Sequence, residues 1–214
     1  DPELSRGLGD VYKRQKLSDG KLPMHPMDVS LSIQENLDED TFVVFDGGDY
    51  CHFSRATVPI EKYLRSLYVS SFGMIGVGLP YAIGAKAALP DKKVILVVGD
   101  GSLGFHAPEI DTSVRHNLPV TVVVGNNSLW GIDYWIQKGL YERDVWTKLD
   151  QTNYELVAKG FGAEGLLVDN PELLKNEIKK SLNSNKMTIL NTIVRKISSP
   201  VADAAVTRKL GTHG

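Results

Sequence analysis

The chain has 214 residues, of which 42% are hydrophobic, and its 24 basic and 26 acidic residues leave a net charge of −2. This length allows one substantial core, and the balanced charge without a long basic run excludes an electrostatic surface for nucleic acid or an anionic membrane. We expect a cytoplasmic protein without an internal disulfide, because no run approaches the ~20 apolar residues of a membrane span, the first residues lack a secretory signal pattern, and Cys51 is the only cysteine.

The first predicted elements are a helix and a buried strand. Residues 1–22 begin with a polar, aperiodic stretch, and we interpret them as a linker or as foreign sequence. Pro26 suits the first turn of a helix. The apolar stripe of this helix consists of Val29, Ile33 and Leu37. The β-rich run 41–45 then predicts a buried strand, which stops at the turn residues 46–48.

Strands and helices alternate through the rest of the chain. Further strands are predicted at 67–69, 93–98, 120–124, 165–168 and 187–194, and helices before Leu89, from Pro108, from Gly131, at 154–159 and from Pro171. Continuous apolar strands separated by helices of roughly 10–15 residues are typical of a parallel sheet covered on both faces. We therefore predict a doubly wound α/β domain over residues 23–196, followed by a tail, residues 197–214, without a strong pattern.

Polar side chains follow two of the predicted strands. Asp100 lies between two glycines after one strand, with Ser102 close behind, and Asn126 and Asn127 follow the next strand. In a doubly wound sheet both ends lie at the edge where ligands bind. Carboxylate and amide oxygens suit Mg²⁺, which completes its shell with phosphate oxygens and water, and flanking glycines let the backbone approach a diphosphate. The pattern indicates a metal–diphosphate site.

The spacing of these motifs resembles a known fingerprint. Gly99-Asp100-Gly101, then 24 intervening residues, then Asn126-Asn127 is similar to the motif of thiamine-diphosphate-dependent enzymes, of the acetolactate-synthase-like and benzaldehyde-lyase-like branch. Either motif alone is usually only a turn or a loop. The resemblance implies the thiamine-diphosphate-binding fold. It also implies Mg²⁺ held by the side chains of Asp100 and Asn127 and by the backbone carbonyl of Leu129, with Gly99, Gly101, Ser102 and Asn127 at the cofactor.

A second segment, residues 73–80, resembles the part of this family that surrounds the pyrimidine ring of the cofactor. The resemblance implies that the Gly73 carbonyl accepts a hydrogen bond from the 4′-amino group, and that Ile75 is the apolar wedge that bends the cofactor. The alternative is a glycine-rich helix start with Ile75 in the core. The segment is not a dinucleotide fingerprint, because Tyr81 stands where the third glycine is required.

Three more positions are candidates for the site. At 46–50 the family carries polar residues that touch the diphosphate; because an acid there would repel it, Tyr50 is a better candidate than Asp49, and a plain turn is the alternative. Asp133 fits either a pocket acid or an acid favoured by a helix N-terminus. His106 could face the site, although a single histidine is more often structural.

The resemblance implies an enzyme that makes or breaks carbon–carbon bonds next to a carbonyl, with acetolactate-synthase-like carboligation of 2-oxo acids as the leading interpretation. The alternatives are a decarboxylase or lyase acting on a 2-oxo acid or acyl-CoA, and a non-catalytic module that keeps the cofactor fold. In this family an activating glutamate lies on a separate pyrimidine-binding domain, usually from a second subunit. We therefore expect that domain as a partner, a homo-oligomer, a small 2-oxo acid or hydroxyketone as substrate, and no activity from this chain alone.

Overall fold

A single parallel sheet forms the centre of the molecule. The computed structural model describes residues 19–58, 66–68 and 73–211, with side chains to residue 208. Its strands are β1 (Thr41–Asp46), β2 (Ser66–Tyr68), β3 (Lys93–Gly99), β4 (Thr121–Asn126), β5 (Glu164–Val168) and β6 (Thr188–Ile193). They lie in the order β2-β1-β3-β4-β6-β5, and every pairing is parallel.

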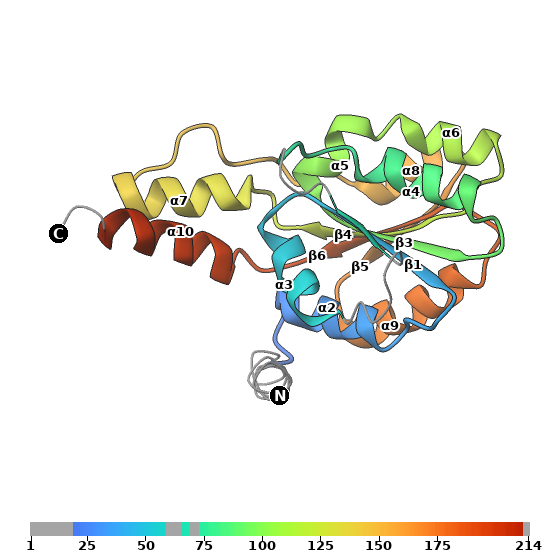
Figure 1. Ribbon diagram of the computed structural model, residues 1–214, viewed down its shortest axis with the longest axis horizontal. Helices are drawn as coiled ribbons and strands as arrows, with labels where there is room; N and C mark the ends of the chain where they lie inside the picture. Colours follow the sequence, from blue (N-terminus) through green and yellow to red (C-terminus); the bar gives the residue numbers. More distant parts are fainter. Residues whose placement is uncertain (1–18, 59–65, 69–72, 212–214) are drawn as a thin grey trace.

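Helices cover both faces of this sheet (Figure 1). The helices are α2 (Pro26–Gln34), α3 (Asp49–Thr57), α4 (Gly78–Ala88), α5 (Asp100–His106), α6 (Glu109–Arg115), α7 (Gly131–Tyr141), α8 (Tyr154–Gly160), α9 (Pro171–Leu182) and α10 (Pro200–Gly211). One core cluster joins α4, α5, α6 and α8 to one face, and a second joins α2, α3 and α9 to the other. The predicted doubly wound α/β architecture is confirmed.

The alternation of side chains along each strand produces the two cores. In β1, Val44 faces the α4 side and Val43 faces the α9 side, and Leu96 and Ile95 in β3 divide in the same way. All four are 2% exposed or less. Because both faces are covered, the strands are apolar on both sides, which is why they appear in the sequence as continuous apolar runs.

Side-chain caps account for two of the predicted helix starts. Before α2, the His25 ring accepts a hydrogen bond from the Met27 N–H at 3.0 Å, and Asp28 accepts one from the His25 N–H at 2.8 Å. Before α9, Asn170 accepts a bond from the Leu173 N–H at 2.9 Å. These contacts satisfy N–H groups that would otherwise lack a partner at a helix start.

Three helices have no counterpart in the sequence prediction, namely α3, α5 and α10. Pro108, expected inside a first helical turn, instead lies at the N-cap position, one residue before α6 begins. The predicted strand at 67–69 corresponds to β2, although its last residue lies outside the described part of the chain, as does most of the segment interpreted as a linker or foreign sequence. Within the described residues, no helix is both long and apolar enough to cross a bilayer.

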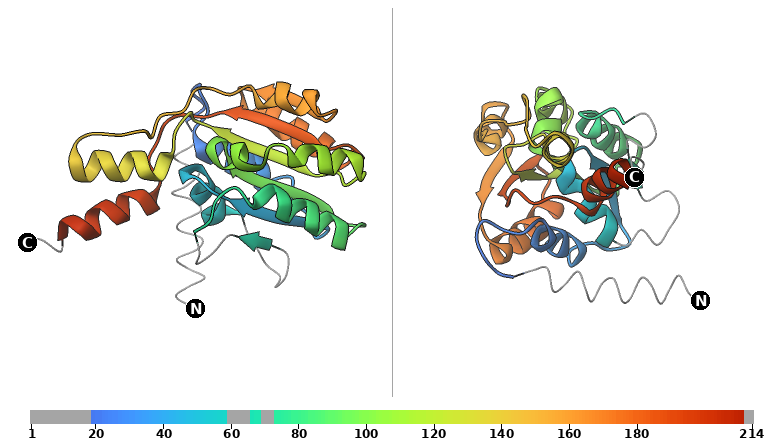
Figure 2. Two further views of the ribbon diagram at one scale, coloured as in Figure 1. Left: turned by 90° about the horizontal axis from the view of Figure 1, so that it is seen from above. Right: turned by 90° about the vertical axis from the view of Figure 1, so that its left-hand side faces the viewer.

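Helices α7 and α10 lie side by side and project together from the body of the molecule (Figures 1 and 2). They touch closely at Gly139, where an added Cβ would lie 2.7 Å from the side chain of Val206. We call α7 and α10 together the arm. It joins the rest of the molecule at the edge of the sheet where β1, β3 and β4 end.

Candidate functional site

The carboxyl ends of three adjacent strands meet at one place. Asp46, the last residue of β1, pairs with Val98 of β3, and Gly99 pairs with Gly125 of β4. The helix that follows β1 packs on one face of the sheet, and the helix that follows β3 packs on the other. The chain therefore reverses its winding between β1 and β3, and such a switch point is where doubly wound sheets bind ligands.

A cavity of about 220 Å³ opens at this switch point. Every residue predicted for the site lines it: Tyr50, Gly73, Ile75, Gly99, Asp100, Gly101, Ser102, Asn127 and Leu129. Seven further residues complete the lining: Gly48, Asp49, Gly125, Trp130, Gly131, Ile132 and Asp133. The fold thus brings together segments that are up to 85 positions apart, from Gly48 to Asp133.

Asp100 is the buried acid at the centre of this arrangement. It is 4% exposed, and its Oδ2 accepts a hydrogen bond from the Ser128 N–H at 2.9 Å. Its backbone carbonyl accepts a bond from the Tyr154 hydroxyl at 2.6 Å. Burial raises the pKa of Asp100 to about 6, against the opposing effect of backbone N–H groups including those of Gly101 and Ser128. A bound cation would remove much of this penalty on the charged form.

The loop after β4 holds Asn127 and Leu129 in place. The Oδ1 atom of Asn127 accepts a hydrogen bond from the Leu129 N–H at 3.1 Å, and Ser128 between them has a φ of 55°. A short antiparallel bridge pairs Leu129 with Lys148. Its hydrogen bonds use the Ser128 carbonyl and the Trp130 N–H, so the bridge does not consume the Leu129 carbonyl.

Two glycines are required here by close packing. Gly47 has a φ of +33°, and a Cβ on it would lie 1.6 Å from the Ser102 hydroxyl oxygen. A Cβ on Gly101 would lie 2.7 Å from the ring of Trp130. Neither position leaves room for a side chain, and Gly101 therefore presents bare backbone to the cavity.

Three residues that line the cavity carry a buried polar atom without a hydrogen-bond partner among the described residues. These atoms are the Ser102 hydroxyl, the Tyr50 hydroxyl and the Oδ1 atom of Asp49, whose Oδ2 accepts a hydrogen bond from the Ser199 N–H at 2.8 Å. Burial also raises the pKa of Asp49, which is 1% exposed. Because buried polar groups in proteins nearly always have partners, these atoms fit a site completed by a polar ligand.

Tyr50 lines the cavity but is 2% exposed, and it packs against the sheet. A Cβ on Gly125 would lie 2.2 Å from its ring, so the ring occupies the space that a larger residue in β4 would need. Burial raises the pKa of its hydroxyl far above the ordinary range. The structure therefore gives Tyr50 a packing role in addition to its place in the cavity wall.

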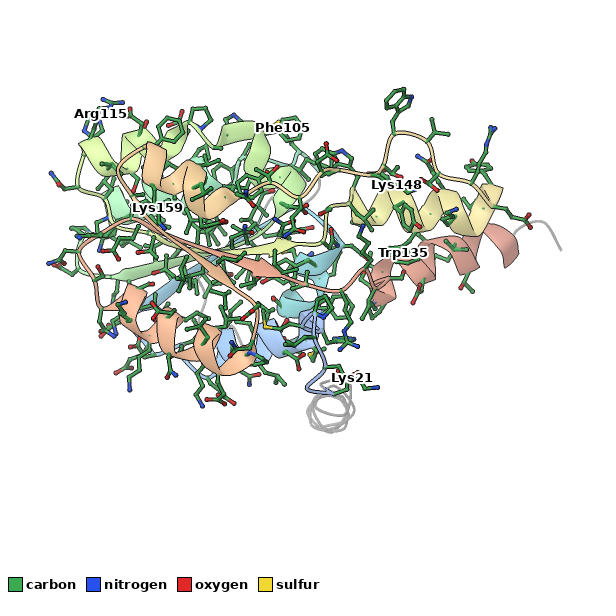
Figure 3. The ribbon with its side chains drawn as sticks, turned by 180° about the vertical axis from the view of Figure 1, so that it is seen from behind. Lys21, Phe105, Arg115, Trp135, Lys148 and Lys159 are labelled. Atoms are coloured by element: carbon green, nitrogen blue, oxygen red, sulfur yellow. The ribbon has the colours of Figure 1, made fainter. Side chains whose placement is uncertain are left out.

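The other candidates lie on different sides of the cavity. Asp133 is an exposed residue of the wall, whereas His106 does not line the cavity and bonds to the backbone of Gly76 instead. Phe105 contacts the Trp130 ring at a centroid distance of 5.7 Å and lies on the body near the base of the arm, while Trp135 belongs to the arm (Figure 3). Sequence reasoning missed Tyr154, since only the fold brings it to Asp100.

The side chains here suit one kind of metal. Over the described ranges, no group of three or more His, Cys, Asp or Glu side chains could hold an ion. The available oxygens are one carboxylate, one side-chain amide and one backbone carbonyl. This set is too small for a protein-only cage but fits Mg²⁺, which keeps water and takes phosphate oxygens from its ligand.

Comparisons with known proteins agree with this geometry. The family model described as "Thiamine pyrophosphate enzyme, C-terminal TPP binding domain" matches residues 46–192. A probable acetolactate synthase of Mycobacterium bovis is 35% identical over 184 residues, which are 85% of this chain and 33% of that protein. A 2-hydroxyacyl-CoA lyase 2 of Danio rerio is 34% identical over 178 residues, or 81% of this chain and 29% of that protein.

Among solved structures, benzoylformate decarboxylase from Polynucleobacter necessarius has the same fold. It matches with a TM-score of 0.78 at 22% identity, over 84% of this chain and 35% of the other. This chain spans about a third of the length of the curated relatives it matches. Since the family model covers well over half of its residues, the chain belongs to the thiamine pyrophosphate enzymes and contains their C-terminal TPP-binding domain.

Proposed function

We propose that this chain forms the magnesium- and diphosphate-binding half of the cofactor site in a thiamine-diphosphate-dependent carboligase. The observation that carries the proposal is the position of Asp100 and Asn127. They directly follow the adjacent strands β3 and β4, they line one cavity of about 220 Å³, and the buried Ser102 hydroxyl in the same lining lacks a partner among the described residues. A metal–diphosphate group would place a cation between Asp100 and Asn127 and an acceptor oxygen at the Ser102 hydroxyl.

In this proposal, Mg²⁺ is bound by the side chains of Asp100 and Asn127 and by the Leu129 carbonyl. The diphosphate lies against the backbone of Gly99 and Gly101, with a hydrogen bond from the Ser102 hydroxyl. That hydroxyl is buried and free to donate, which supports the assignment. Tyr50, whose ring packs against Gly125, would form part of the wall of this site.

Gly73 and Ile75 act on the organic part of the cofactor. Thiamine diphosphate supplies the stabilisation of negative charge next to a carbonyl, and the protein binds and orients it. The Gly73 carbonyl accepts a hydrogen bond from the 4′-amino group, and Ile75 holds the cofactor bent. Gly73 is exposed at the cavity rim and Ile75 is half-buried in its wall, which supports these two roles.

The rest of the site comes from elsewhere. Because the relatives are about three times as long, we propose that a pyrimidine-binding domain, contributed by a second subunit of a homo-oligomer, completes the site. In this proposal the activating glutamate of that domain supplies the proton relay through the pyrimidine ring. The side chains of Tyr141, at the end of α7, and of Trp146, in the loop that follows α7, are 62% and 94% exposed and give an apolar surface for such contacts.

Carboligation of 2-oxo acids is the proposed reaction, since a probable acetolactate synthase is 35% identical over most of the chain. A second candidate is cleavage of a 2-hydroxyacyl-CoA. The 34% identity to a 2-hydroxyacyl-CoA lyase 2 favours it nearly as well. The two differ in substrate contacts that lie largely outside this chain.

Calorimetric titration of the chain with thiamine diphosphate tests the binding proposal. We expect binding in Mg²⁺, none in EDTA, and none for thiamine, which lacks the diphosphate. Equal affinity for thiamine, or binding that is insensitive to EDTA, would contradict a metal–diphosphate site.

A turnover assay tests the division of labour between domains. With pyruvate or benzoin, Mg²⁺ and thiamine diphosphate, the purified chain is expected to show no useful carboligation or decarboxylation. Robust turnover that disappears in Asp100→Ala would show that the chain carries its own activating acid, and the proposed need for a second domain would be wrong.

A further inference from the structure

Asp46 is a buried acid that the proposed binding of metal and diphosphate does not use. It ends β1, it is 0% exposed, and it does not line the cavity. Its Oδ2 atom accepts hydrogen bonds from the N–H groups of Gly76 at 2.9 Å and Gly78 at 2.8 Å. One carboxylate thus fastens the segment that leads from Gly73 into helix α4.

The same segment is held from its other side by helix α5. The Nδ1 atom of His106 lies 2.7 Å from the Gly76 carbonyl oxygen. Because a carbonyl only accepts hydrogen bonds, Nδ1 must carry the proton. Gly76 has a φ of +95°, and a Cβ on it would lie 2.6 Å from Phe105, so the segment sits tightly against the end of α5. Gly76 is therefore bonded at its N–H to β1 and at its carbonyl to α5.

Burying a carboxylate to shape a turn costs more free energy than burying a neutral polar side chain. Burial raises the pKa of Asp46, against the bonds from Gly78 and Gly76. An unpaired carboxylate at this depth destabilises the fold unless its hydrogen bonds are well made. A serine or asparagine turn would hold a loop at lower cost, so the two charge-assisted bonds suggest that the position of the segment matters.

This anchoring connects the segment to the metal side of the cavity. The Gly99 N–H donates to the Gly47 carbonyl at 3.3 Å, next to Asp46, and Asp100 follows Gly99. A Cβ on Gly47 would lie 3.0 Å from the Ile75 side chain. The two ends of the cavity are thus built on one rigid frame of β1 and β3.

We propose that Asp46 and His106 are positioning residues that fix Gly73 and Ile75 at a set distance from the diphosphate site. We call these two residues, with their bonds to Gly76 and Gly78, the clamp. The inference rests on the proposed function, because it assigns the clamp to the binding of the organic part of thiamine diphosphate. Asp46 acts through the Gly76 and Gly78 amides, and His106 acts through the Gly76 carbonyl. Neither residue lines the cavity.

Two ligands separate the halves of the site. Thiamine diphosphate would contact both the metal loop and the segment at 73–78, whereas inorganic pyrophosphate would contact only the metal side. We would titrate the chain, in Mg²⁺, with each ligand, using the wild type, Asp46→Asn and His106→Gln. Asp40→Asn, at the other end of β1 and exposed, is the matched control.

Asp46→Asn replaces one acceptor with an amide nitrogen that cannot accept a bond from either glycine. We expect affinity for thiamine diphosphate to fall by about tenfold in this variant while affinity for pyrophosphate changes by less than about twofold. His106→Gln should lower the affinity for thiamine diphosphate relative to that for pyrophosphate by a smaller factor. This variant provides the test if Asp46→Asn does not fold. Asp40→Asn should change neither affinity.

Hydrogen exchange gives a second readout. The Gly76 and Gly78 amides should lose protection in Asp46→Asn, while the β1 and β3 amides keep theirs. Equal losses for both ligands, or unchanged exchange at the two glycines, would overturn the clamp. Equal affinity of the wild type for both ligands would also overturn it but leave the diphosphate site standing; no binding of either would instead contradict the proposed function.

Discussion

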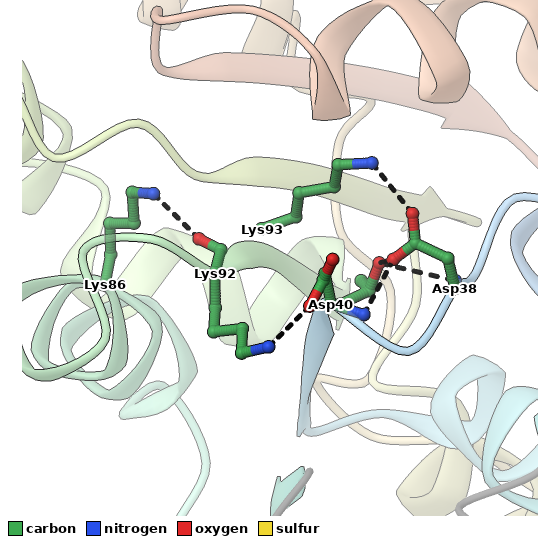
Figure 4. A network of polar contacts seen from close by, with 6 residues as sticks. Asp38, Asp40, Lys86, Lys92 and Lys93 are labelled. Carbon is green, nitrogen blue, oxygen red and sulfur yellow. Dashed lines mark hydrogen bonds and ion pairs between the residues drawn. The ribbon is translucent and has the colours of Figure 1, made fainter.

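The two ends of strands β1 and β3 carry acids in opposite environments. At the amino end, Asp40 and Asp38 lie at the surface, where Lys92 contacts Asp40 at 2.5 Å and Lys93 contacts Asp38 at 2.8 Å (Figure 4). Although partial burial opposes it, the bonds from Lys93 and from the Thr41 hydroxyl keep the pKa of Asp38 below its ordinary value. These acids already have their cations within the fold.

At the carboxyl end the acids are buried, and none of them pairs with a cation among the described residues. Asp46, Asp49 and Asp100 are 4% exposed or less, and burial raises the pKa of each. The comparison shows that the acids at the amino end form ion pairs that stabilise the fold. The acids at the carboxyl end are buried, and only backbone amides or a ligand can offset the desolvation cost of their charge.

The largest expected effect is the difference in cofactor affinity between a variant that removes a buried acid at the carboxyl end and one that removes an exposed acid at the amino end. Asp100→Ala removes the charged metal ligand, so Mg²⁺-dependent affinity for thiamine diphosphate should fall by at least about a hundredfold. Asp38→Ala is the matched control and should bind normally. Calorimetry measures both, and unchanged affinity in the Asp100 variant would defeat the metal assignment.

Glycine substitutions extend the comparison to packing. Gly125→Ala would drive a methyl group into the Tyr50 ring and should destabilise the chain by about 2–3 kcal/mol. At Gly84, in the middle of α4, an added Cβ meets nothing within 4 Å, so Gly84→Ala should stabilise by about 0.5–1 kcal/mol. Urea unfolding measures both changes; equal stabilities would mean that the contact with Tyr50 relaxes freely.

The buried acid should also give stability a distinctive pH dependence. The pKa of Asp100 is about 6 in the folded chain, above its ordinary value of 3.8, so the folded state binds this proton more tightly than the unfolded state. The stability of the metal-free chain should therefore fall as pH rises from about 4 to about 6 through this group.

Asp100→Asn removes that penalty. In EDTA at pH 7.5 it should be more stable than the wild type by about 1–2 kcal/mol, and the difference should disappear near pH 4. Unfolding curves at the two pH values provide the measurement. A constant difference between the two proteins at both values would show that the Asp100 charge does not destabilise the fold.

The smallest effect is expected at the amino end, with the opposite sign. Because the pKa of Asp38 is lowered, its contribution is present above the ordinary pKa and is lost as the pH falls through the folded value. Asp38→Ala should cost only about 0.2–1 kcal/mol at neutral pH, since the pair with Lys93 is partly exposed. High salt should reduce that loss, and a salt-independent loss would point to the Thr41 bond instead.

The sequence predicted the sheet well because its strands are buried on both faces. Runs such as 94–98 and 122–124 have no polar residue to confuse the period, and each is followed directly by a glycine. Helix α5 could not be predicted in this way, because Gly101 and Gly104 disfavour a helix and tertiary packing overrides that preference. Helix α10 lacks a clear stripe and is defined by its contact with α7.

The same distinction between local sequence signals and tertiary contacts applies to the candidate site. The motif spacing predicted residues that lie near strand ends, and the fold gathers all of them around one cavity. Contacts that depend on distant segments were out of reach. The Tyr154 hydroxyl meets the Asp100 carbonyl across 54 positions, and Asp46 meets the Gly76 N–H across 30 positions.

The carboxylate of Asp49 has one further consequence. Its Oδ2 accepts a hydrogen bond from the Ser199 N–H just before α10, while its Oδ1 is buried without a partner among the described residues. Helix α7 begins beside it, at Gly131, where a Cβ would lie 2.7 Å from the Asp49 side chain. Both roots of the arm therefore converge on a single residue of the cavity wall. By thermodynamic reciprocity, any ligand that favours one placement of Asp49 favours the matching placement of the arm, and a contact that fixes the arm favours that ligand to the same degree.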